Sequence, residues 1–162
     1  MNRSYKEDLR FPDLRGNYVW DLMNKNDYRT GIVKAPGIRR TYEIDGFIAL
    51  GLSNDSKVYP KNLNLTRDET PIHKGKRIPK RIELMMENLE KRENALSQLM
   101  EKEWDLLIFV AKEPDNITHL VEDWPKVKEV YRKMDEHLSL ILENLDDCNL
   151  LIASDHSIKE IK

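Results

Sequence analysis

Apolar and polar positions in the first half of the chain predict one short helix, two strands and a loop. Residues 17–26 carry apolar side chains on one face, as a short amphipathic helix does. Residues 28–35 fit a buried strand that Pro36-Gly37 ends, and residues 46–51 follow as an apolar run bounded by glycines. Residues 53–77 are polar and show little periodicity, so we expect a loop or a small excursion there.

The second half of the chain predicts a long helix, then a strand, a helix and a second strand. Pro79 fits the first turn of a helix that continues to Glu101 with apolar residues at helical spacing. The apolar run in residues 105–111 is typical of a parallel strand covered on both faces, and residues 149–153 fit a second buried strand. Asp123 fits the N-cap of the helix between them. The expected apolar stripe of that helix consists of Val127, Val130, Tyr131, Met134, Leu138, Ile141 and Leu142.

A strand, a crossover helix and a second strand form a parallel unit in nearly all folds, and this succession predicts the fold class. We expect an α/β fold with a mostly parallel sheet flanked by helices, in a single domain that spans residues 1–162. Hydrophobic residues make up 40% of the chain and charged residues 35%, with a net charge of −2. These values exclude a disordered chain and a polybasic nucleic-acid binder, so we do not expect nucleic acid as a partner.

Cysteine content restricts the kind of metal site that this chain could build. Cys148 is the only cysteine, which excludes an intrachain disulfide and a zinc site made of several thiolates. Any metal ion must therefore bind through histidine and carboxylate side chains. The first ten residues lack the apolar core of a signal peptide, and no apolar stretch reaches the length that spans a bilayer. The sequence predicts a soluble cytoplasmic protein without membrane contact.

Two polar clusters, each with one aspartate and one histidine, follow the two expected strands of the second half. Asp115 and His119 come after the first of these strands, and Asp155 and His156 come directly after the second. Because the carboxyl ends of parallel strands meet at one edge of a sheet, both clusters could face one site. Carboxylate oxygen and imidazole nitrogen are the donors that zinc or manganese accepts when no thiolate is present.

Each cluster alone is weak evidence for a metal site, because Asp-x-x-x-His also occurs as a capped turn with a surface histidine. The conjunction is stronger, since two of the four histidines each accompany an aspartate directly after an expected strand. The other two histidines are ordinary in their setting: His73 falls in a polar loop, and His137 falls near the end of a helix, where a positive charge suits the dipole. One basic cluster could contact phosphate groups, but a solvated loop is the simpler reading. It consists of Lys74, Lys76, Arg77, Lys80 and Arg81.

Several stretches resemble the nucleotide pyrophosphatase/phosphodiesterase branch of the alkaline-phosphatase superfamily. The strongest are Trp104-Asp105-Leu106-Leu107-Ile108-Phe109-Val110, Glu113-Pro114-Asp115-x-x-x-His119 and Leu151-Ile152-Ala153-Ser154-Asp155-His156. Earlier stretches resemble archaeal members, namely Val33-Lys34-Ala35-Pro36, Thr41-Tyr42, Gly46-Phe47-Ile48 and Tyr59-Pro60. The resemblance covers most of this chain and matches only the middle part of the family's length.

The resemblance implies a partial alkaline-phosphatase-like domain and a site for one or two divalent metal ions, zinc or manganese. Asp115 and His119 would bind one ion, and Asp155 and His156 the other. In such enzymes a metal pair clamps a phosphate ester during an in-line displacement. The family also uses an aspartate near its N-terminus, a threonine or serine nucleophile and a later histidine, and we identify no counterpart of these three in this sequence.

Two hypotheses about function follow from the surviving motifs and the unidentified nucleophile. The first is a fragment-like, metal-dependent phosphodiesterase or phosphatase that hydrolyses phosphate esters only with a complementing chain. The alternative is a non-catalytic α/β protein that keeps the fold and associates with itself, because a partial domain exposes apolar surface that a second copy can cover.

Overall fold

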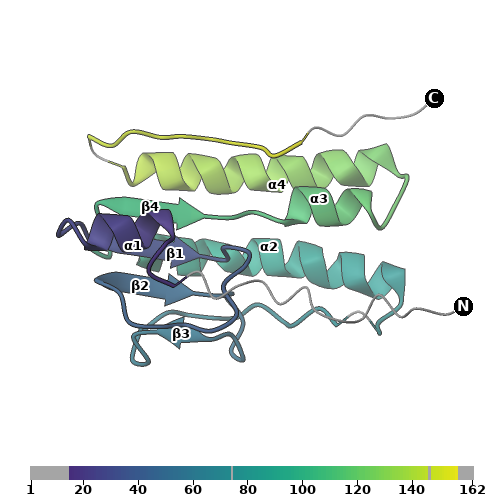
Figure 1. The fold of residues 1–162 in the computed structure, drawn as a ribbon. Helices are drawn as coiled ribbons and strands as arrows, with labels where there is room; N and C mark the ends of the chain where they lie inside the picture. The colour runs from purple at the N-terminus through teal and green to yellow at the C-terminus, as the bar shows by residue number, and fades with distance from the viewer. Residues whose placement is uncertain (1–14, 74, 146, 157–162) are drawn as a thin grey trace, which may run out of the picture. The chain divides into compact units, whose positions relative to one another are not determined.

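The computed structural model describes residues 15–73, 75–145 and 147–156, and the contacts among them define two compact units (Figure 1). The first unit holds the described residues up to Gly51, together with Lys57–Leu63 and Glu103–Val110. The second holds Leu52–Ser56, Asn64–Lys102 and the described residues from Ala111 onward. The sheet lies in the first unit and three helices lie in the second, so each unit is described by itself.

The first unit is a four-stranded sheet with one short helix. The strands lie in the order β3-β2-β1-β4; β1 pairs in parallel with β2 and with β4, and β2 pairs antiparallel with β3. The prediction of an α/β fold with a mostly parallel sheet is therefore confirmed. The elements of this unit are α1 (Val19–Asn24), β1 (Thr30–Val33), β2 (Gly46–Ala49), β3 (Val58–Tyr59) and β4 (Leu106–Phe109).

Strand β1 lies at the centre of this unit's core. Ile32 on β1 and Ile48 on β2 are fully buried and pack with Trp20 from α1. The indole N–H of Trp20 donates to the hydroxyl of Tyr42 at 2.6 Å, and that hydroxyl donates to Asp21 at 2.9 Å. Burial raises the pKa of Tyr42, which keeps its hydroxyl protonated as a donor. Apolar contact and this polar chain together fix α1 on the sheet.

Gly46 allows β2 to approach β1 closely at the start of their pairing. Its backbone φ is +125°, a conformation that residues with a side chain rarely adopt. A Cβ atom at this position would lie 2.0 Å from the carbonyl oxygen of Thr30, its partner in register. The glycine that bounds this apolar run in the sequence is thus required by both backbone conformation and space.

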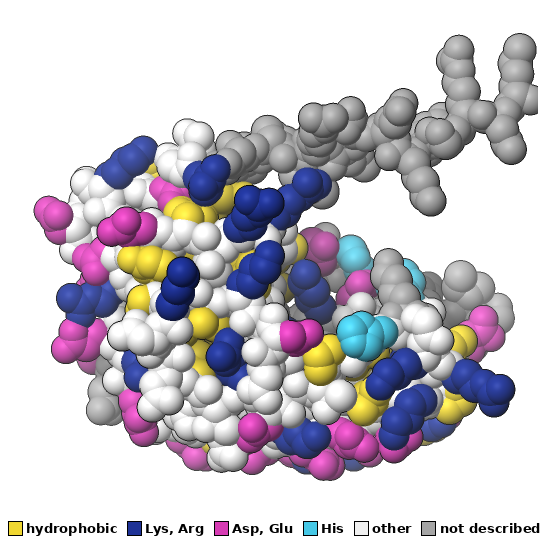
Figure 2. All heavy atoms as spheres, turned by 90° about the horizontal axis from the view of Figure 1, so that it is seen from below, with side chains coloured by type: hydrophobic (Ala, Val, Ile, Leu, Met, Phe, Trp, Pro, Cys, Tyr) yellow, Lys and Arg dark blue, Asp and Glu magenta, His cyan; other side chains and the backbone are white. Residues whose placement is uncertain are grey.

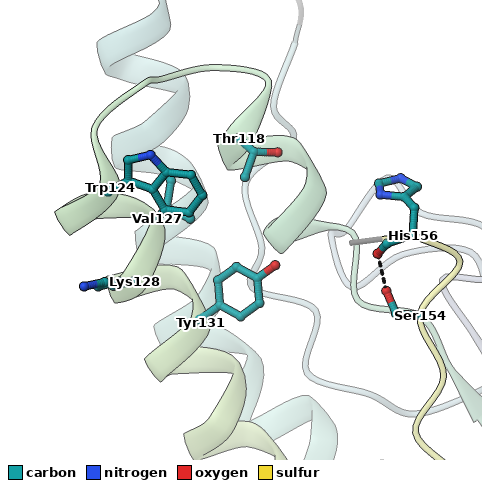
Figure 3. Close-up of a pocket in the computed structure, with 7 residues that line it drawn as sticks. All are labelled: Thr118, Trp124, Val127, Lys128, Tyr131, Ser154 and His156. Carbon is teal, nitrogen blue, oxygen red and sulfur yellow. Dashed lines mark hydrogen bonds between the residues drawn. The ribbon is translucent and has the colours of Figure 1, made fainter. Parts of the chain in front are cut away.

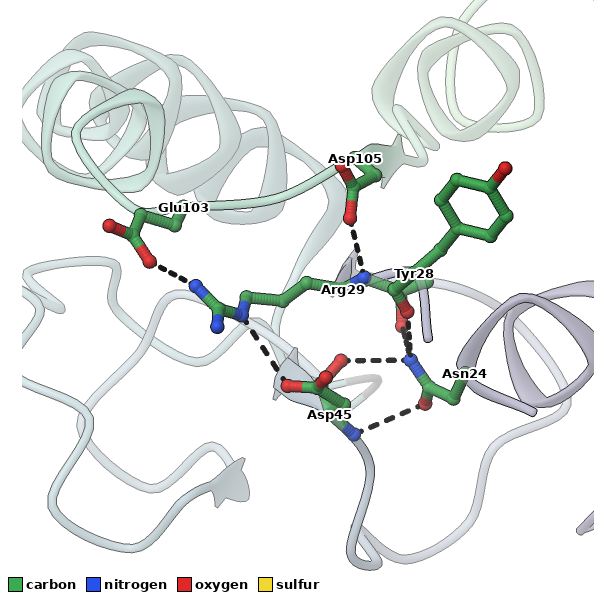
Figure 4. A network of polar contacts seen from close by, with 7 residues as sticks. Asn24, Tyr28, Arg29, Asp45, Glu103 and Asp105 are labelled. Carbon is green, nitrogen blue, oxygen red and sulfur yellow. Dashed lines mark hydrogen bonds and ion pairs between the residues drawn. The ribbon is translucent and has the colours of Figure 1, made fainter. Parts of the chain in front are cut away.

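Polar side chains close the amino ends of the parallel strands (Figure 4). The Asn24 amide group donates to the carbonyl oxygen of Asp45 at 2.9 Å and accepts from its N–H at 3.2 Å. The carboxylate of Asp105 accepts from the N–H of Arg29 at 2.7 Å. The guanidinium of Arg29 in turn pairs with Asp45 and Glu103. The residues before β1, β2 and β4 are thereby tied to one another.

The second unit is built on two long helices and one short helix: α2 (Ile78–Met100), α3 (Glu113–Thr118) and α4 (Trp124–Glu143). Both long helices were predicted, and each has proline in its first turn. Their shared core includes Leu89 on α2, Ile117 on α3 and Val130 on α4, all fully buried. No described helix combines the length and apolar character that crossing a lipid bilayer requires.

The segment from Thr66 to Thr70, called the strap below, is held along α2 by side-chain hydrogen bonds. Gln98 on α2 exchanges hydrogen bonds with Thr66, with a 2.7 Å contact to the hydroxyl. Asn88 accepts from the N–H of Thr70 at 2.7 Å and donates to its carbonyl at 2.8 Å. Residues 53–77 are thus mostly irregular, as predicted, although β3 falls inside that range.

The predicted apolar stripe of α4 is wrong for two of its residues, Tyr131 and Leu142. Val127, Val130 and His137 are its buried residues, whereas Tyr131 is 48% and Leu142 is 47% exposed. Residues at spacings of three, four and seven follow one line along a helix, and His137 continues the line of Val127 and Val130. Tyr131 was included in the predicted stripe because its side chain is hydrophobic, but that side chain lies on a half-exposed face of α4.

The strand predicted at residues 149–153 is also wrong. This segment has no strand conformation, and Leu151 and Ile152 are 89% and 68% exposed. Among the described residues it has no strand to pair with, and an extended segment gains stability only when a neighbour satisfies its backbone. The predicted strand-helix-strand unit therefore does not form, although its first strand, β4, and its helix, α4, do.

Candidate functional site

Asp115 and His119 lie one turn apart on α3, the short helix that follows β4 in sequence. His119 is the C-cap residue of α3, and its Nε2 atom lies 3.2 Å from Oδ1 of Asp115. The hydroxyl of Thr118 donates to the backbone carbonyl of Asp115 at 2.7 Å, which tightens the end of the helix. The i, i+4 spacing read from the sequence therefore places both side chains on one helix face.

His156 reaches the same carboxylate from a different segment. Its Nε2 atom lies 3.8 Å from Oδ1 of Asp115 and 3.8 Å from Oδ1 of Asp155. The hydroxyl of Ser154 donates to the backbone carbonyl of His156 at 2.6 Å and forms a compact turn (Figure 3). Asp115 thus has an imidazole on two sides, one from its own helix and one from the segment after α4.

The structure brings Asp115, His119 and His156 together. The fourth predicted ligand, Asp155, lies near His156 but is almost fully exposed. The side chain of Asp155 is 92% exposed, while that of Asp115 is 45% exposed. The predicted grouping at two adjacent strand ends is not observed, because residues 149–153 form no strand. The clusters instead approach through α3 and an irregular segment, both in the second unit.

The carboxylate and imidazole groups of this cluster are chemically suited to a zinc or manganese ion, and one of the two distances between them fits such a site. Two ligands at about 2.1 Å from one tetrahedral ion lie about 3.4 Å apart, close to the 3.2 Å between Asp115 and His119. The 3.8 Å between Asp115 and His156 is somewhat longer. Within residues 15–73, 75–145 and 147–156, no three His, Cys, Asp or Glu side chains are arranged to hold an ion as they stand. The ligand prediction therefore stays a prediction.

An open pocket of about 690 Å³ adjoins this cluster (Figure 3). Trp124, Lys128 and Tyr131 line it from α4, and His156 belongs to both the pocket and the cluster. The pocket combines aromatic and apolar walls with one cation. The full lining is Thr118, Trp124, Val127, Lys128, Tyr131, Ser154 and His156.

Buried charge near this site was not foreseen from the sequence. The guanidinium of Arg92, on α2, is 1% exposed and lies 2.7 Å from carboxylate oxygens of Glu69 and Glu113. His137, predicted as an ordinary helix-end residue, is also 1% exposed and makes a 2.7 Å contact with the carbonyl of Leu89. Burial lowers the pKa of His137, and the positive charge of Arg92 lowers it further.

The side chains on the surface carry both signs of charge. Figure 2 shows Lys and Arg interspersed with Asp and Glu over one face, as the nearly balanced composition leads one to expect.

Comparison with protein families gives one result that covers nearly the whole chain. The family model described as type I phosphodiesterase / nucleotide pyrophosphatase matches residues 3–162. Searches of the curated proteins and of the solved structures gave no match.

Proposed function

Because the chain belongs to the type I phosphodiesterase / nucleotide pyrophosphatase family, we propose that it binds a divalent metal ion and acts on phosphate esters. The family is generally metal-dependent. We assign zinc or manganese as the ion and Asp115, His119 and His156 as its principal ligands, with Asp155 as a fourth. The observation that carries this proposal is the carboxylate of Asp115 with imidazole nitrogens at 3.2 Å and 3.8 Å from two separate segments.

One shared ion suits this arrangement better than the two pairs expected from the resemblance. Asp115 is near both imidazoles, whereas Asp155 is near His156 alone among the described residues. A bound divalent ion supplies charge that stabilises the oxygens of a phosphoryl group. The protein's part is to hold the donors: the Thr118 hydroxyl secures the turn of α3, and the Ser154 hydroxyl secures the turn that carries His156.

Hydrolysis in this proposal requires a second polypeptide that supplies the nucleophile. Among the residues that the structure describes, Thr118 and Ser154 carry the hydroxyls next to the cluster in sequence, and each donates its proton to a backbone carbonyl. A nucleophilic hydroxyl needs an adjacent general base or a metal ion instead. These two side chains are better explained as turn-forming groups, which supports a role for a complementing chain.

A second candidate function, a non-catalytic protein that associates with itself, is favoured by one observation. Leu151 and Ile152 expose most of their apolar surface in adjacent positions. Exposed apolar side chains of this kind mark interaction sites when they form a continuous patch. Sedimentation of the purified protein, with Leu151→Ser, Ile152→Ser as the comparison, separates this candidate from the first.

The experiment that tests the proposed function measures zinc and manganese bound to protein that has been stripped with a chelator and re-equilibrated. We expect about one ion per chain, lost in Asp115→Ala and in His119→Ala. His73→Ala is the matched control, because His73 is an exposed histidine outside the cluster. Equal metal content in the wild type, the cluster variants and the control would overturn the assignment. Cleavage of a chromogenic phosphodiester with and without a candidate complementing chain then tests the reaction.

A further inference from the structure

Arg92 is the most deeply buried charged side chain near the cluster, and it joins three segments of the second unit. It lies on α2 and is 1% exposed. Its Nε–H donates to Oε1 of Glu69, on the strap before α2, at 2.7 Å. Its Nη2 donates to Oε1 of Glu113, the first residue of α3, also at 2.7 Å.

Both carboxylates stabilise the buried charge of the guanidinium. Burial alone would lower the pKa of Arg92, but attraction to Glu113, and then to Glu69, raises it above its ordinary value. A buried charge is stable only when opposite charges and hydrogen bonds replace its hydration. The planar fork of arginine lets one side chain satisfy both partners, which a lysine ammonium cannot reproduce.

The contact with Glu113 restrains the helix that carries two of the assigned ligands. Helix α3 has six residues, too few for a stable helix without tertiary contacts. The buried residues of α3 among those that the structure describes are Ile117, which is fully buried, and Glu113 in the first turn. Asp115 and His119 lie on the same helix and are exposed, so their direction depends on how these two residues hold α3.

We propose that Arg92 and Glu113 are positioning residues for the metal-binding cluster: their ion pair sets the orientation of α3 and, with it, the distance from Asp115 on α3 to His156 on the segment after α4. This inference rests on the proposed function, because it names the residues that prepare the same site. Groups outside the ligand set that orient the ligands commonly change metal affinity by about 10-fold to 100-fold.

Glu69 is the matched comparison for Glu113, because both carboxylates pair with Arg92. It balances Arg92 at the same distance as Glu113, yet it belongs to the strap and not to α3. A purely structural role of the buried charges predicts similar effects of Glu69→Gln and Glu113→Gln on every property. A positioning role predicts that only Glu113→Gln alters the ligands.

The test combines zinc affinity, measured by competition with a chelating indicator, and imidazole NMR spectra of the metal-free protein. We expect Glu113→Gln to weaken zinc binding about tenfold and to shift the His119 and His156 resonances. Glu69→Gln should lower the thermal midpoint to a similar degree but leave zinc affinity within about twofold. If Glu113→Gln does not fold, Arg92→Lys takes its place, with Lys91→Met, a solvent-facing neighbour on α2, as its control.

The outcomes separate this inference from the proposed function. Absence of zinc binding by the wild type overturns the proposed function, and the NMR spectra of the metal-free variants then decide the positioning role alone. Zinc binding by the wild type with equal effects of Glu69→Gln and Glu113→Gln overturns the positioning role and leaves the metal site intact. Resonance shifts confined to Glu113→Gln support the positioning role in either case.

Discussion

Strand β1 and residues 149–153 are both short apolar runs, but one is buried and the other is exposed. Ile32 and Val33 of β1 have no exposed surface, whereas Leu151 and Ile152 are mostly in solvent. Strand β1 has a parallel partner on each side, β2 and β4. Residues 149–153 have no strand partner among the residues that the structure describes.

The difference shows that partners, more than hydrophobicity, decide which apolar run becomes a strand. Leu-Leu-Ile-Ala is at least as apolar as the Thr-Gly-Ile-Val of β1. Arg29, directly before β1, is also held by the side chains of Asp45 and Asp105, which precede β2 and β4 (Figure 4). Backbone groups that find such partners leave water at little cost, and those that do not stay hydrated.

The largest expected effect comes from Gly46→Ala, which forces β1 and β2 apart. The strained φ of +125° and a Cβ atom 2.0 Å from the carbonyl of Thr30 should together lower the free energy of unfolding by about 4 kcal/mol. Gly37→Ala is the control, because Gly37 also has a positive φ but has open space around the added Cβ. It should cost about 1 kcal/mol. Urea unfolding measures both, and equal losses would contradict the role of the close approach.

Truncating one side chain in each run tests the comparison directly. Ile32→Ala removes fully buried atoms from the centre of the sheet and should cost about 3 kcal/mol. Ile152→Ala removes atoms that are already in water and should change stability by no more than about 0.5 kcal/mol. The same unfolding measurement decides the matter. A large loss in Ile152→Ala would mean that this residue is covered in solution, either within the chain or by a second copy.

A smaller effect is expected from the polar groups that flank each run. The Asn24 side chain contacts the carbonyl of Tyr28 at 2.8 Å and both backbone groups of Asp45 (Figure 4). Asn24→Ala leaves these groups without their partner and should cost about 2 kcal/mol. Ser154→Ala removes one exposed hydrogen bond beside the other run and should cost less than about 0.5 kcal/mol. Amide exchange at Thr30 gives a local measure, and unchanged protection there in Asn24→Ala would contradict the stabilising role of the network.

Most elements of the fold could be predicted from the sequence, since hydrophobic periodicity marks them. The long helices α2 and α4 and the strands β1, β2 and β4 appear close to their expected positions. The strand at residues 149–153 was predicted wrongly because an apolar run does not reveal whether a partner strand exists. Helix α3 was missed because six residues carry too little periodicity to distinguish a helix from a turn.

The candidate site could be predicted only as far as local spacing extends. Asp115 and His119 were paired on the family resemblance, and α3 brings them together because residues four apart share one helix face. The approach of His156 was expected for a different reason than the one observed. The ion pairs of Arg92 could not be foreseen, because Glu69 and Glu113 are 23 and 21 residues away from it. In a chain with 35% charged residues, sequence does not single out the few that are buried, such as Arg92.

The smallest expected effect is that of acid on stability. It acts through His137 in the second unit and not through β1. His137 on α4 is buried against α2, and its contact with the carbonyl of Leu89 suits a neutral imidazole that donates from Nε2. Burial and the positive charge of Arg92 lower its pKa below the ordinary 6.5, against the opposing influence of the Leu89 hydrogen bond and of Glu93 and Glu113. The stabilisation is complete above the unfolded pKa, where His137 is neutral in both states.

As the pH falls from 6.5 toward the lowered folded pKa of His137, the unfolded chain binds more protons, and the free energy of unfolding must decrease. His137→Gln keeps an N–H donor for the carbonyl of Leu89 and removes the titration, so this variant should lose less stability over the same pH range. Urea unfolding at about pH 8 and about pH 5, on both sides of the ordinary histidine pKa, measures the difference. Parallel pH dependence of the wild type and His137→Gln would show that other groups govern the acid response. A steeper decline in the wild type, with amide protection in β1 unchanged, would place the acid sensitivity in the packing of α4 on α2.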